Sequence, residues 1–437
     1  MVCWEVVAFV TTSLYNRGVF EVIKMIVRPK GTNDILPQDI WRWHKLEAMV
    51  HEQCACFGFK EIRTPIFEET GLFQRGIGEA TDIVEKEMYT FEDKGGRSLS
   101  LRPEGTASVV RAYIENNLAG ASLPVKLYYL GPMFRYERPQ SGRYRQFHQF
   151  GVECFGTLEP TLDAEVIMLA NELYHKLGAK NVVLKLNSIG CPDCRTKYIA
   201  KLQEELKKEH DKLCPNCQRR STTNPLRVLD CKEEMCQATI TSLPKIKDYL
   251  CPECSDHYEK LKHILQIWEI PYIEEPRLVR GFDYYTKTVF EFSVESLGAQ
   301  NAVGGGGRYD KLVEEIGGPA TPAVGFAMGI ERTLLSVGET WEKAPDLDVY
   351  IVTIGDEARE EALLQLIKAR KKGLKAEMDI LGRSVKAQFK QAGKSGARFC
   401  LILGSDELKE GKIKLKNMQS GEETQLPKDD WLGGVNK

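Results

Sequence analysis

The sequence predicts an α+β domain built on an antiparallel sheet, a cysteine-rich insertion within it, and a smaller α/β domain at the end of the chain. Within residues 128–156, two strand-like runs flank a polar loop, which is typical of a long hairpin. Eight of the 13 cysteines fall within residues 191–254. Beyond residue 346, strand and helix patterns alternate, as in a small sheet covered by helices. A chain of 437 residues has room for several such domains.

Composition narrows the classes of protein that fit this chain. Sixty basic residues against 62 acidic ones exclude a uniformly basic surface for nucleic acid, so any such contact must use local patches. No apolar run approaches the length of a membrane span, and we expect a cytoplasmic protein without membrane contact.

The first 24 residues do not fit the pattern of the rest. They lack a basic start, and their longest apolar stretch, Val6 to Val10, is too short for a secretory core. Met25 opens a more regular sequence. We expect residues 1–24 to be a disordered extension or the product of a mis-assigned start. The remaining expected boundaries are a main domain over 25–337 with its insertion at about 190–255, a linker over 338–346 and a last domain over 347–437.

The first predicted element is a helix over residues 40–57. Trp43, Leu46, Val50 and Cys54 recur there at helical spacing, and Gly58 ends the run. The strand-like segment 59–69 is broken at Pro65. Proline cannot donate to a sheet ladder, so this strand is expected at a sheet edge or at a subunit boundary.

Two more helices and a strand–helix pair complete the main domain. A helix is expected after Thr106, and another over 163–177 that ends at Gly178. Residues 323–335 are expected to form a strand followed by a helix.

The loop of the long hairpin is rich in arginine. Arg135, Arg138, Arg143 and Arg145 alternate with aromatic residues there. A guanidinium group is planar and permanently charged, and it grips phosphate oxygens in pairs. The pattern therefore predicts a polyphosphate site, while a solvated surface loop is the alternative.

Several separate stretches, in order along the chain, resemble the class II aminoacyl-tRNA synthetases. The helix with the Pro65 strand, the arginine hairpin, and GFAMGIERTLL (325–335) resemble the three signatures of that class. RPKGTNDILP (28–37), LVRGFDYYTKTVFEF (278–292) and GGGGRYD (304–310) resemble signatures of the bacterial histidyl-tRNA synthetase family. The resemblance covers nearly all of the chain from Met25 and implies the class II synthetase fold with its antiparallel sheet, a homodimer and a C-terminal anticodon-binding domain.

The family implies a reaction in two steps. Histidine and ATP, which carries Mg²⁺, give histidyl-adenylate, and the histidyl group then passes to the 3′ end of the histidine tRNA. By resemblance, Arg135 and Arg280 hold the α-phosphate, while Arg143 and Arg332 hold the β- and γ-phosphates. The alternatives are structural ion pairs, Arg135 with Glu137 or Glu153 and Arg280 with Asp283. Glu137 is a candidate ligand of Mg²⁺.

The resemblance also implies a histidine pocket. Its expected residues are Glu104, Gly105, Thr106, Gln149, Glu153, Tyr284 and Tyr285. Two alternatives stay open, since Glu104 could balance a helix dipole and one of the two tyrosines could face solvent.

The insertion carries four pairs of cysteines: Cys191 and Cys194, Cys214 and Cys217, Cys231 and Cys236, Cys251 and Cys254. The first two pairs fit the spacing of a four-cysteine structural zinc site. Reduced cysteines packed as small hydrophobic residues are the alternative.

The last domain carries a local excess of positive charge. Residues 368–416 hold 14 basic and five acidic residues, which predicts contact with a phosphate backbone. Two other functions remain open for the whole chain. A catalytically inactive relative could sense histidine or regulate a biosynthetic enzyme, and a scaffold could bind RNA without catalysis.

Overall fold

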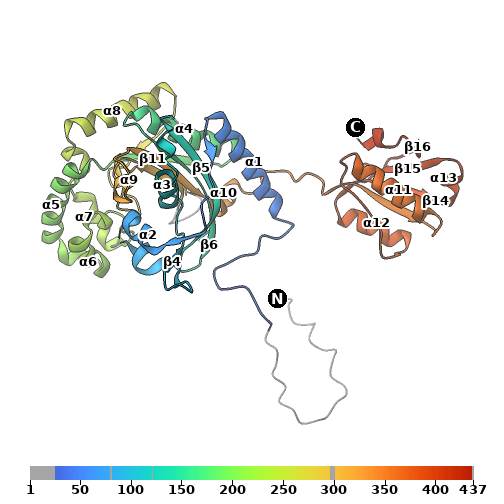
Figure 1. Cartoon of the computed structure of the whole chain (residues 1–437), viewed down its shortest axis with the longest axis horizontal. Coiled ribbons are helices and arrows are strands. Elements are labelled where there is room, and N and C mark those ends of the chain that lie inside the picture. The colour runs from blue at the N-terminus through green and yellow to red at the C-terminus, as the bar shows by residue number, and fades with distance from the viewer. Residues whose placement is uncertain (1–24, 79–80, 121, 296–300, 436–437) are drawn as a thin grey trace, which may run out of the picture. The chain divides into compact units, whose positions relative to one another are not determined.

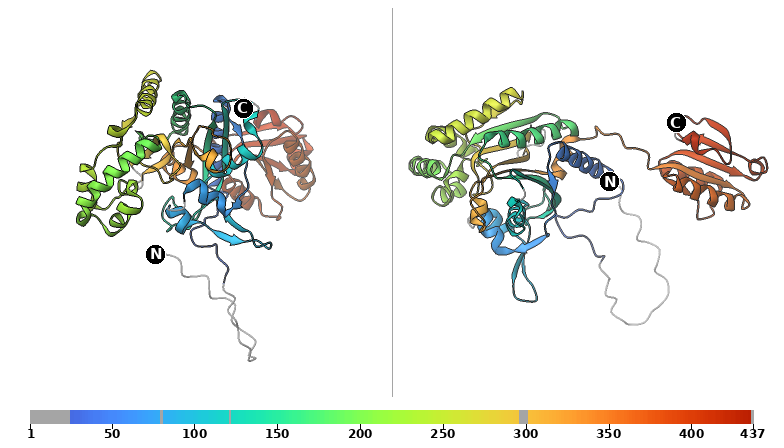
Figure 2. Two further views of the ribbon diagram at one scale, coloured as in Figure 1. Left: turned by 60° about the vertical axis from the view of Figure 1, so that its left-hand side comes forward. Right: turned by 45° about the horizontal axis from the view of Figure 1, so that its top comes forward.

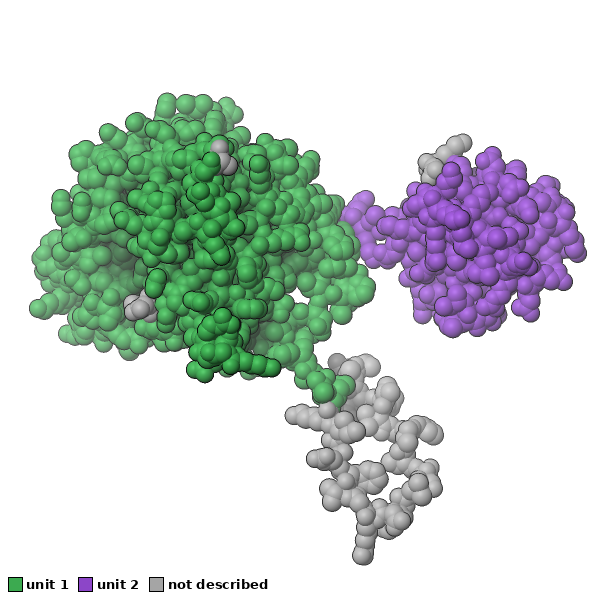
Figure 3. All heavy atoms as spheres, in the orientation of Figure 1, with its two compact units in different colours: residues 1–340 green, residues 341–437 purple. Residues whose placement is uncertain are grey.

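The computed structural model describes residues 25–78, 81–120, 122–295 and 301–435. The predicted extension over residues 1–24 lies outside these residues. The chain divides into two units, Met1–Thr340 and Trp341–Lys437, which are coloured separately in Figure 3. No helix in the described part of the chain is long and apolar enough to span a membrane.

An eight-stranded sheet is the centre of the first unit (Figure 1), in the order β1-β5-β6-β11-β10-β9-β7-β8. The six inner strands are antiparallel, and only the edge strands β1 and β8 pair in parallel. The predicted antiparallel sheet is therefore confirmed. Its strands are β1 (Lys60–Glu61), β5 (Val125–Phe134), β6 (Gln146–Phe155), β7 (Val182–Ser188), β8 (Ile273–Glu274), β9 (Thr286–Val294), β10 (Ala302–Arg308) and β11 (Ala323–Gly329).

The segment around Pro65 divides as predicted. Lys60–Glu61 lies at the edge of the large sheet, and β2 (Phe67–Glu69) joins a separate three-stranded sheet with β4 (Ser98–Leu101) and β3 (Thr90–Glu92). The chain changes sheet at the proline, where a continuous ladder would lose a donor.

Helices cover both faces of the large sheet. The elements are α1 (Ile40–Cys56), α2 (Thr70–Ile77), α3 (Thr106–Glu115), α4 (Pro160–Leu177), α9 (Leu312–Glu315) and α10 (Ile330–Val337). The predicted helices are confirmed, although α4 begins at Pro160, where a proline suits the first turn. Gly178 ends α4 with φ 73°, a left-handed conformation that glycine adopts without strain.

The two faces of the sheet have different partners. On one face, Phe290, Phe292 and Phe326 pack around Tyr174 of α4. The opposite face packs against α3 and α9 and includes Tyr129, Phe155 and Tyr285. Because side chains alternate along a strand, Gln149 and Glu153 of β6 lie on the same face as Phe155.

The insertion is a helical layer with its own core (Figure 2, green to yellow). It consists of α5 (Pro192–Lys208), α6 (Pro215–Thr223), α7 (Glu234–Ser242) and α8 (Pro252–Ile267), joined by 3-10 turns that include Pro225–Val228. Its core contains Tyr198, Leu202, Leu206, Val228 and Ile240, together with three cysteines.

The second unit is the predicted small mixed sheet with helices. Its strand order is β13-β12-β14-β15-β16, parallel from β13 to β14 and antiparallel beyond. The elements are β12 (Leu347–Ile354), α11 (Ala358–Lys371), β13 (Ala376–Met378), α12 (Val385–Lys394), β14 (Ala397–Gly404), α13 (Ser405–Lys409), β15 (Lys412–Asn417), β16 (Glu423–Pro427) and α14 (Leu432–Val435).

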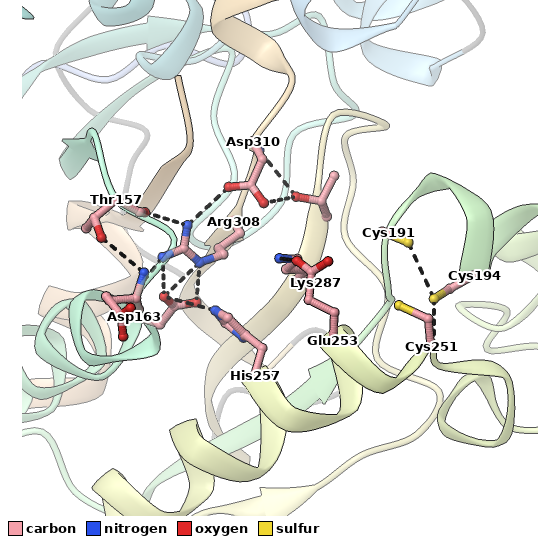
Figure 4. Close-up of polar contacts among 12 residues, drawn as sticks. Thr157, Asp163, Cys191, Cys194, Cys251, Glu253, His257, Lys287, Arg308 and Asp310 are labelled. Atoms are coloured by element: carbon pink, nitrogen blue, oxygen red, sulfur yellow. Dashed lines mark hydrogen bonds and ion pairs between the residues drawn. The ribbon is translucent and has the colours of Figure 1, made fainter. Parts of the chain in front are cut away.

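A buried ion pair joins the sheet to α4 (Figure 4). The Arg308 and Asp163 side chains are both inaccessible to solvent, with Arg308 Nη2 2.8 Å from Asp163 Oδ2. Arg308 also donates to Asp310 Oδ1 at 3.1 Å and to the Thr157 carbonyl at 3.0 Å. Every side of this guanidinium is therefore matched by an acceptor, as a buried charge requires.

Replacing Asp163 with asparagine leaves Arg308 buried without its main counter-charge. We expect D163N to lower the free energy of unfolding of this unit by about 3–5 kcal/mol. Urea unfolding followed by circular dichroism measures this. The control is E314Q, which breaks the half-exposed pair of Lys311 and Glu314 and should change stability by less than about 1 kcal/mol. Equal effects of the two variants would contradict the assignment.

Candidate active site

Arg135 lies directly after β5, where the strand fixes its backbone. Its Nε donates to the Pro103 carbonyl at 2.8 Å, and its guanidinium lies over the Phe147 and Phe282 rings, 5.3 and 5.8 Å from the ring centroids. Glu137 is its ion-pair partner at 3.8 Å. This partner matches one predicted alternative, but the pair is largely buried and not on the open surface, with 17% of each side chain exposed.

Arg280 lies within the stretch 278–285, which carries no strand. Its Nη1 donates to Glu291 Oε2 at 2.9 Å, so the ion-pair partner of Arg280 is Glu291 and not the expected Asp283. The guanidinium lies against β10, since a Cβ built on Gly305 would come within 2.7 Å of it. The glycine run 304–307 thus allows a close approach by a protein side chain.

Arg143 and Arg332 lie next to one another. Arg332 lies in the first turn of α10, which follows β11, and Arg143 Nη1 donates to Glu137 Oε2 at 2.9 Å. Burial, followed by the charge of Arg143, lowers the pKa of Arg332. Two cations held this close favour the binding of an anion between them.

The four arginines form one chain of charges with two carboxylates. Glu137 forms ion pairs with both Arg135 and Arg143. Glu291 forms an ion pair with Arg280, and its charge also acts to raise the pKa of Arg332. The structure thus brings together all four predicted phosphate-binding residues.

Glu153 is the most buried member of the expected histidine pocket, with 1% of its surface exposed. Thr106 Oγ1 donates to one carboxyl oxygen at 2.8 Å, and the Tyr309 hydroxyl donates to the other. Burial raises the pKa of Glu153 to about 8, although both hydroxyl bonds favour the charged form. Gly325 lies opposite Glu153 on β11, and a Cβ there would collide with the carboxyl group.

Glu104 makes the contacts expected of a helix-start acid. Its carboxyl group accepts the backbone N–H groups of Thr106 at 2.6 Å and Ala107 at 2.8 Å, at the start of α3. Burial raises the pKa of Glu104 against the effect of these bonds. Glu104 therefore has a structural role here, and it stays within the same buried cluster because Thr106 also bonds Glu153.

Two buried polar atoms near this cluster have no hydrogen-bond partner among the described residues. They are the Tyr129 hydroxyl and Gln149 Oε1. Gly105 and Gly151 flank the Tyr129 ring so closely that a Cβ at either position would overlap it. A buried polar atom without a partner costs stability, so these two atoms favour a polar ligand.

Tyr284 and Tyr285 are both buried, 5% and 6% exposed, so the expectation that one could face solvent is wrong. Their ring centroids lie 4.7 Å apart, and Tyr284 stacks on Phe282 and meets Tyr309 edge-on. The two rings form an aromatic wall beside Glu153 and Tyr129.

Sequence reasoning did not single out Tyr129 or Tyr309. Tyr309 lies inside the GGGGRYD stretch, and Tyr129 lies two residues before Gly131 on the first strand of the hairpin. Strand alternation places Tyr129 on the face of Glu153, and this signal could have identified it.

The cysteines form two groups of four. The sulfurs of Cys191, Cys194, Cys251 and Cys254 lie within 4.8 Å of one another, as do those of Cys214, Cys217, Cys231 and Cys236. The spacing argument that joined the first two pairs was therefore wrong. The fold brings the end of the insertion back to its start, which sequence separation does not reveal.

Comparison with known proteins agrees with this geometry. The profile described as histidyl-tRNA synthetase matches residues 31–333, and the profile described as anticodon binding domain matches residues 348–437. The chain belongs to the histidyl-tRNA synthetase family. The predicted family, the class II fold and the aminoacyl-tRNA ligase activity are confirmed, and ATP with Mg²⁺ is used throughout the family.

Curated relatives of this synthetase are similar over almost their whole length. "Histidine--tRNA ligase" of Desulforamulus reducens is 53% identical over 92% of this chain and 97% of the relative. The protein of that name from Halothermothrix orenii is 52% identical over 91% of this chain and 96% of its own. Among solved structures, apo S. aureus histidyl-tRNA synthetase has a TM-score of 0.79 and 41% identity, covering 94% of this chain and 100% of that one.

The raised pKa of Glu153 predicts a pH dependence of stability. The folded unit keeps a proton on Glu153 up to a pH of about 8, whereas the unfolded chain releases it above the ordinary pKa of 4.5. The stabilisation is therefore fully present below pH 4.5 and is lost as the pH rises to about 8. The loss should amount to roughly 3–5 kcal/mol. E153Q keeps the shape without the titration. Thermal melting at several pH values should therefore show that the stability of E153Q rises relative to that of the wild type between pH 5 and 8. Parallel curves of stability against pH for the two proteins would contradict this prediction.

Proposed function

We propose that the synthetase activates L-histidine with ATP between the four arginines and the pocket around Glu153, and then transfers histidine to the 3′ end of tRNA-His. The observation that carries this proposal is the chain of four arginines with two carboxylates, beside a buried pocket with unpartnered polar atoms. A polyanion fits the first part, and a small polar amino acid fits the second.

Activation needs little covalent chemistry from the protein. A carboxylate oxygen of histidine attacks the α-phosphorus, and the bond from that phosphorus to the oxygen of pyrophosphate breaks. Arg135 and Arg280 would offset the charge that spreads over the α-phosphate oxygens, while Arg143 and Arg332 would hold the leaving pyrophosphate. Mg²⁺ accompanies ATP, and Glu137, already bonded to Arg143, is the proposed carboxylate nearest to it.

Histidine recognition would use the polar atoms of the pocket. The Tyr129 hydroxyl, Gln149 and Thr106 are proposed for the ammonium end, with Glu153 and the wall of Tyr284 and Tyr285 for the imidazole. A site that satisfies both ring nitrogens rejects apolar amino acids of similar size, because its own polar groups would be left unpaired. Glu104 would act by fixing the start of α3.

The second unit would bind the tRNA through its basic surface. Lys386, Lys390 and Lys394 are exposed and spaced by four along α12, so they share one face of the helix. In the part of the chain that the structure describes, none of the three has an ion-pair partner. By contrast, Lys412, Lys414 and Lys416 of β15 are each paired with a glutamate.

A homodimer is part of the proposal. Apolar side chains are exposed on the small sheet, with Phe67 52% and Phe91 44% exposed and their rings 6.5 Å apart. This sheet follows the Pro65 segment, which resembles the dimer signature of the class. We also place the synthetase in the cytoplasm, where cysteines usually stay out of disulfides, as the twelve described cysteines do. The insertion is proposed to bind structural zinc through the two cysteine groups.

The first experiment is charging of bacterial tRNA by the purified chain with ATP and Mg²⁺. Histidine should be attached, and none of the other amino acids should be when tested singly. A folded protein that charges tRNA with no amino acid would overturn the proposed reaction.

Exchanging Arg135 or Arg280 for lysine keeps the charge and removes the planar fork. We expect R135K and R280K each to lower histidine-dependent ATP–pyrophosphate exchange by about 10²-fold or more, mainly in kcat. R97K, which alters an exposed arginine paired with Asp93, is the control. Normal exchange in either variant would remove that arginine from the mechanism.

Removing the charges of Lys386, Lys390 and Lys394 together should weaken tRNA binding. We expect the triple alanine variant to raise KM for tRNA and to reduce the slope of log affinity against log salt by about 2–3. Pyrophosphate exchange, which needs no tRNA, should stay normal. The matched control replaces Lys412, Lys414 and Lys416, whose charges are already neutralised, and an equal effect of both triples would argue against a specific α12 surface.

A further inference from the structure

The insertion holds both neighbours of Arg280. Val279 packs in the core of the insertion, together with Cys214, Cys217 and Cys236, whereas Leu278 packs in the core of the main domain. On the other side of Arg280, the Gly281 carbonyl accepts a hydrogen bond from Arg227 Nη2. The insertion therefore holds the backbone on both sides of Arg280, while Leu278 anchors the same segment in the main domain.

Further contacts join the insertion to the rest of this stretch. Arg195 Nη1 of α5 donates to the Tyr285 carbonyl at 2.9 Å and to the Asp283 carbonyl at 3.3 Å. Asn224 Nδ2 lies 3.5 Å from Asp283 Oδ1. We refer to residues 278–285 as the Arg280 loop. The insertion contacts its backbone at three carbonyl groups, those of Gly281, Asp283 and Tyr285.

Arg227 itself lies between two cysteines of one group. It belongs to the 3-10 turn Pro225–Val228, which begins shortly after Cys217 in α6 and ends shortly before Cys231. Arg227 also lies 3.8 Å from Asp230, the residue before Cys231. Whatever fixes Cys217 and Cys231 therefore fixes the segment that carries Arg227.

The sulfur geometry of both groups fits a tetrahedral ion. Zinc–sulfur bonds of about 2.3 Å place the sulfurs of a four-cysteine site about 3.8 Å apart. Cys191 Sγ lies 3.5 Å from Cys194 Sγ, and Cys214 Sγ lies 3.9 Å from Cys231 Sγ. These separations are far longer than a disulfide bond of about 2.05 Å.

Backbone N–H groups support a bound metal at both places. The N–H of Cys251 points to Cys194 Sγ at 3.1 Å, and the N–H of Cys214 points to Cys236 Sγ at 3.2 Å. Such bonds stabilise the negative charge of metal-bound thiolates. A cluster packed only as small hydrophobic residues would not need them.

We propose that the two groups are separate zinc sites, and that the one formed by Cys214, Cys217, Cys231 and Cys236 positions Arg280 through Arg227 and Val279. We call this the inner site. Arg227 is a positioning residue, because it touches the backbone beside Arg280 and not the substrate. This inference rests on the proposed role of Arg280 in activation.

The other group, Cys191, Cys194, Cys251 and Cys254, is the neck site. It joins the residue that follows Gly190 to the first turn of α8, so it closes the insertion where the chain enters and leaves. Figure 4 shows Cys191, Cys194 and Cys251 near the 2.7 Å ion pair of Glu253 with Lys287, the second residue of β9. This ion pair joins α8 to the main sheet beside the neck site.

Metal analysis of the purified full chain tests the two sites. We expect two zinc ions per chain in the wild type, one in C217S, one in C254S and none in the double variant. C400S, which alters a buried cysteine of the second unit, should keep two. A wild-type chain that is active in pyrophosphate exchange with eight freely titratable insertion thiols and no zinc would overturn the proposal.

Kinetics and hydrogen exchange test the positioning role. We expect C217S and R227A each to lower kcat of histidine-dependent pyrophosphate exchange by about 10–100-fold with a smaller change in KM. Both should speed deuterium uptake in residues 276–286, a readout that simple loss of stability elsewhere would not localise there. C217H, which can still bind zinc, should restore the metal and most of the activity.

R227A keeps all eight cysteines, so it stays informative if C217S fails to fold. Normal exchange and normal deuterium uptake in R227A would overturn the positioning role. If the wild type binds two zinc ions but shows no exchange with histidine, the proposed function fails and the zinc assignment stands, so the two failures are distinguishable.

Discussion

A carboxyl group buried in the middle of an antiparallel sheet is the constraint around which the site is built. Glu153 can lie there only because Gly325 opposite has no side chain and because Thr106 and Tyr309 donate to both of its oxygens. Those donors come from α3 and from the residue after β10. The cost of burying this group therefore fixes how three separate parts of the chain meet.

The phosphate side of the site follows a different principle. Its arginines are held in place by ion pairs with Glu137 and Glu291, which orient the guanidinium groups. Aromatic rings under Arg135 add a weak attraction and exclude water. Guanidinium groups oriented in advance lose little entropy when the ligand arrives, which favours catalysis by positioning.

The insertion extends this arrangement beyond the sheet. The Arg280 loop runs between two hydrophobic cores, with Leu278 in one and Val279 in the other. Because the loop is anchored in both cores, its position depends on the rigidity of both cores. In a helical layer with a modest core, the two proposed zinc sites would offer rigidity that apolar packing alone supplies less well.

The sequence alone determined the class of fold, the order of most elements and the residue types of the site. Periodicity in 40–57, the glycine after Leu177 and the break at Pro65 are local signals, and local signals survive without tertiary information. The arginines and Glu153 could be named because their stretches resemble a family. Tertiary structure decided which groups meet: Glu291 with Arg280, Tyr309 with Glu153, and Cys191 with Cys251. Each of these pairs joins residues that are distant in the sequence or on different elements, and their contact depends on sheet register and on where the chain returns, which no local pattern encodes.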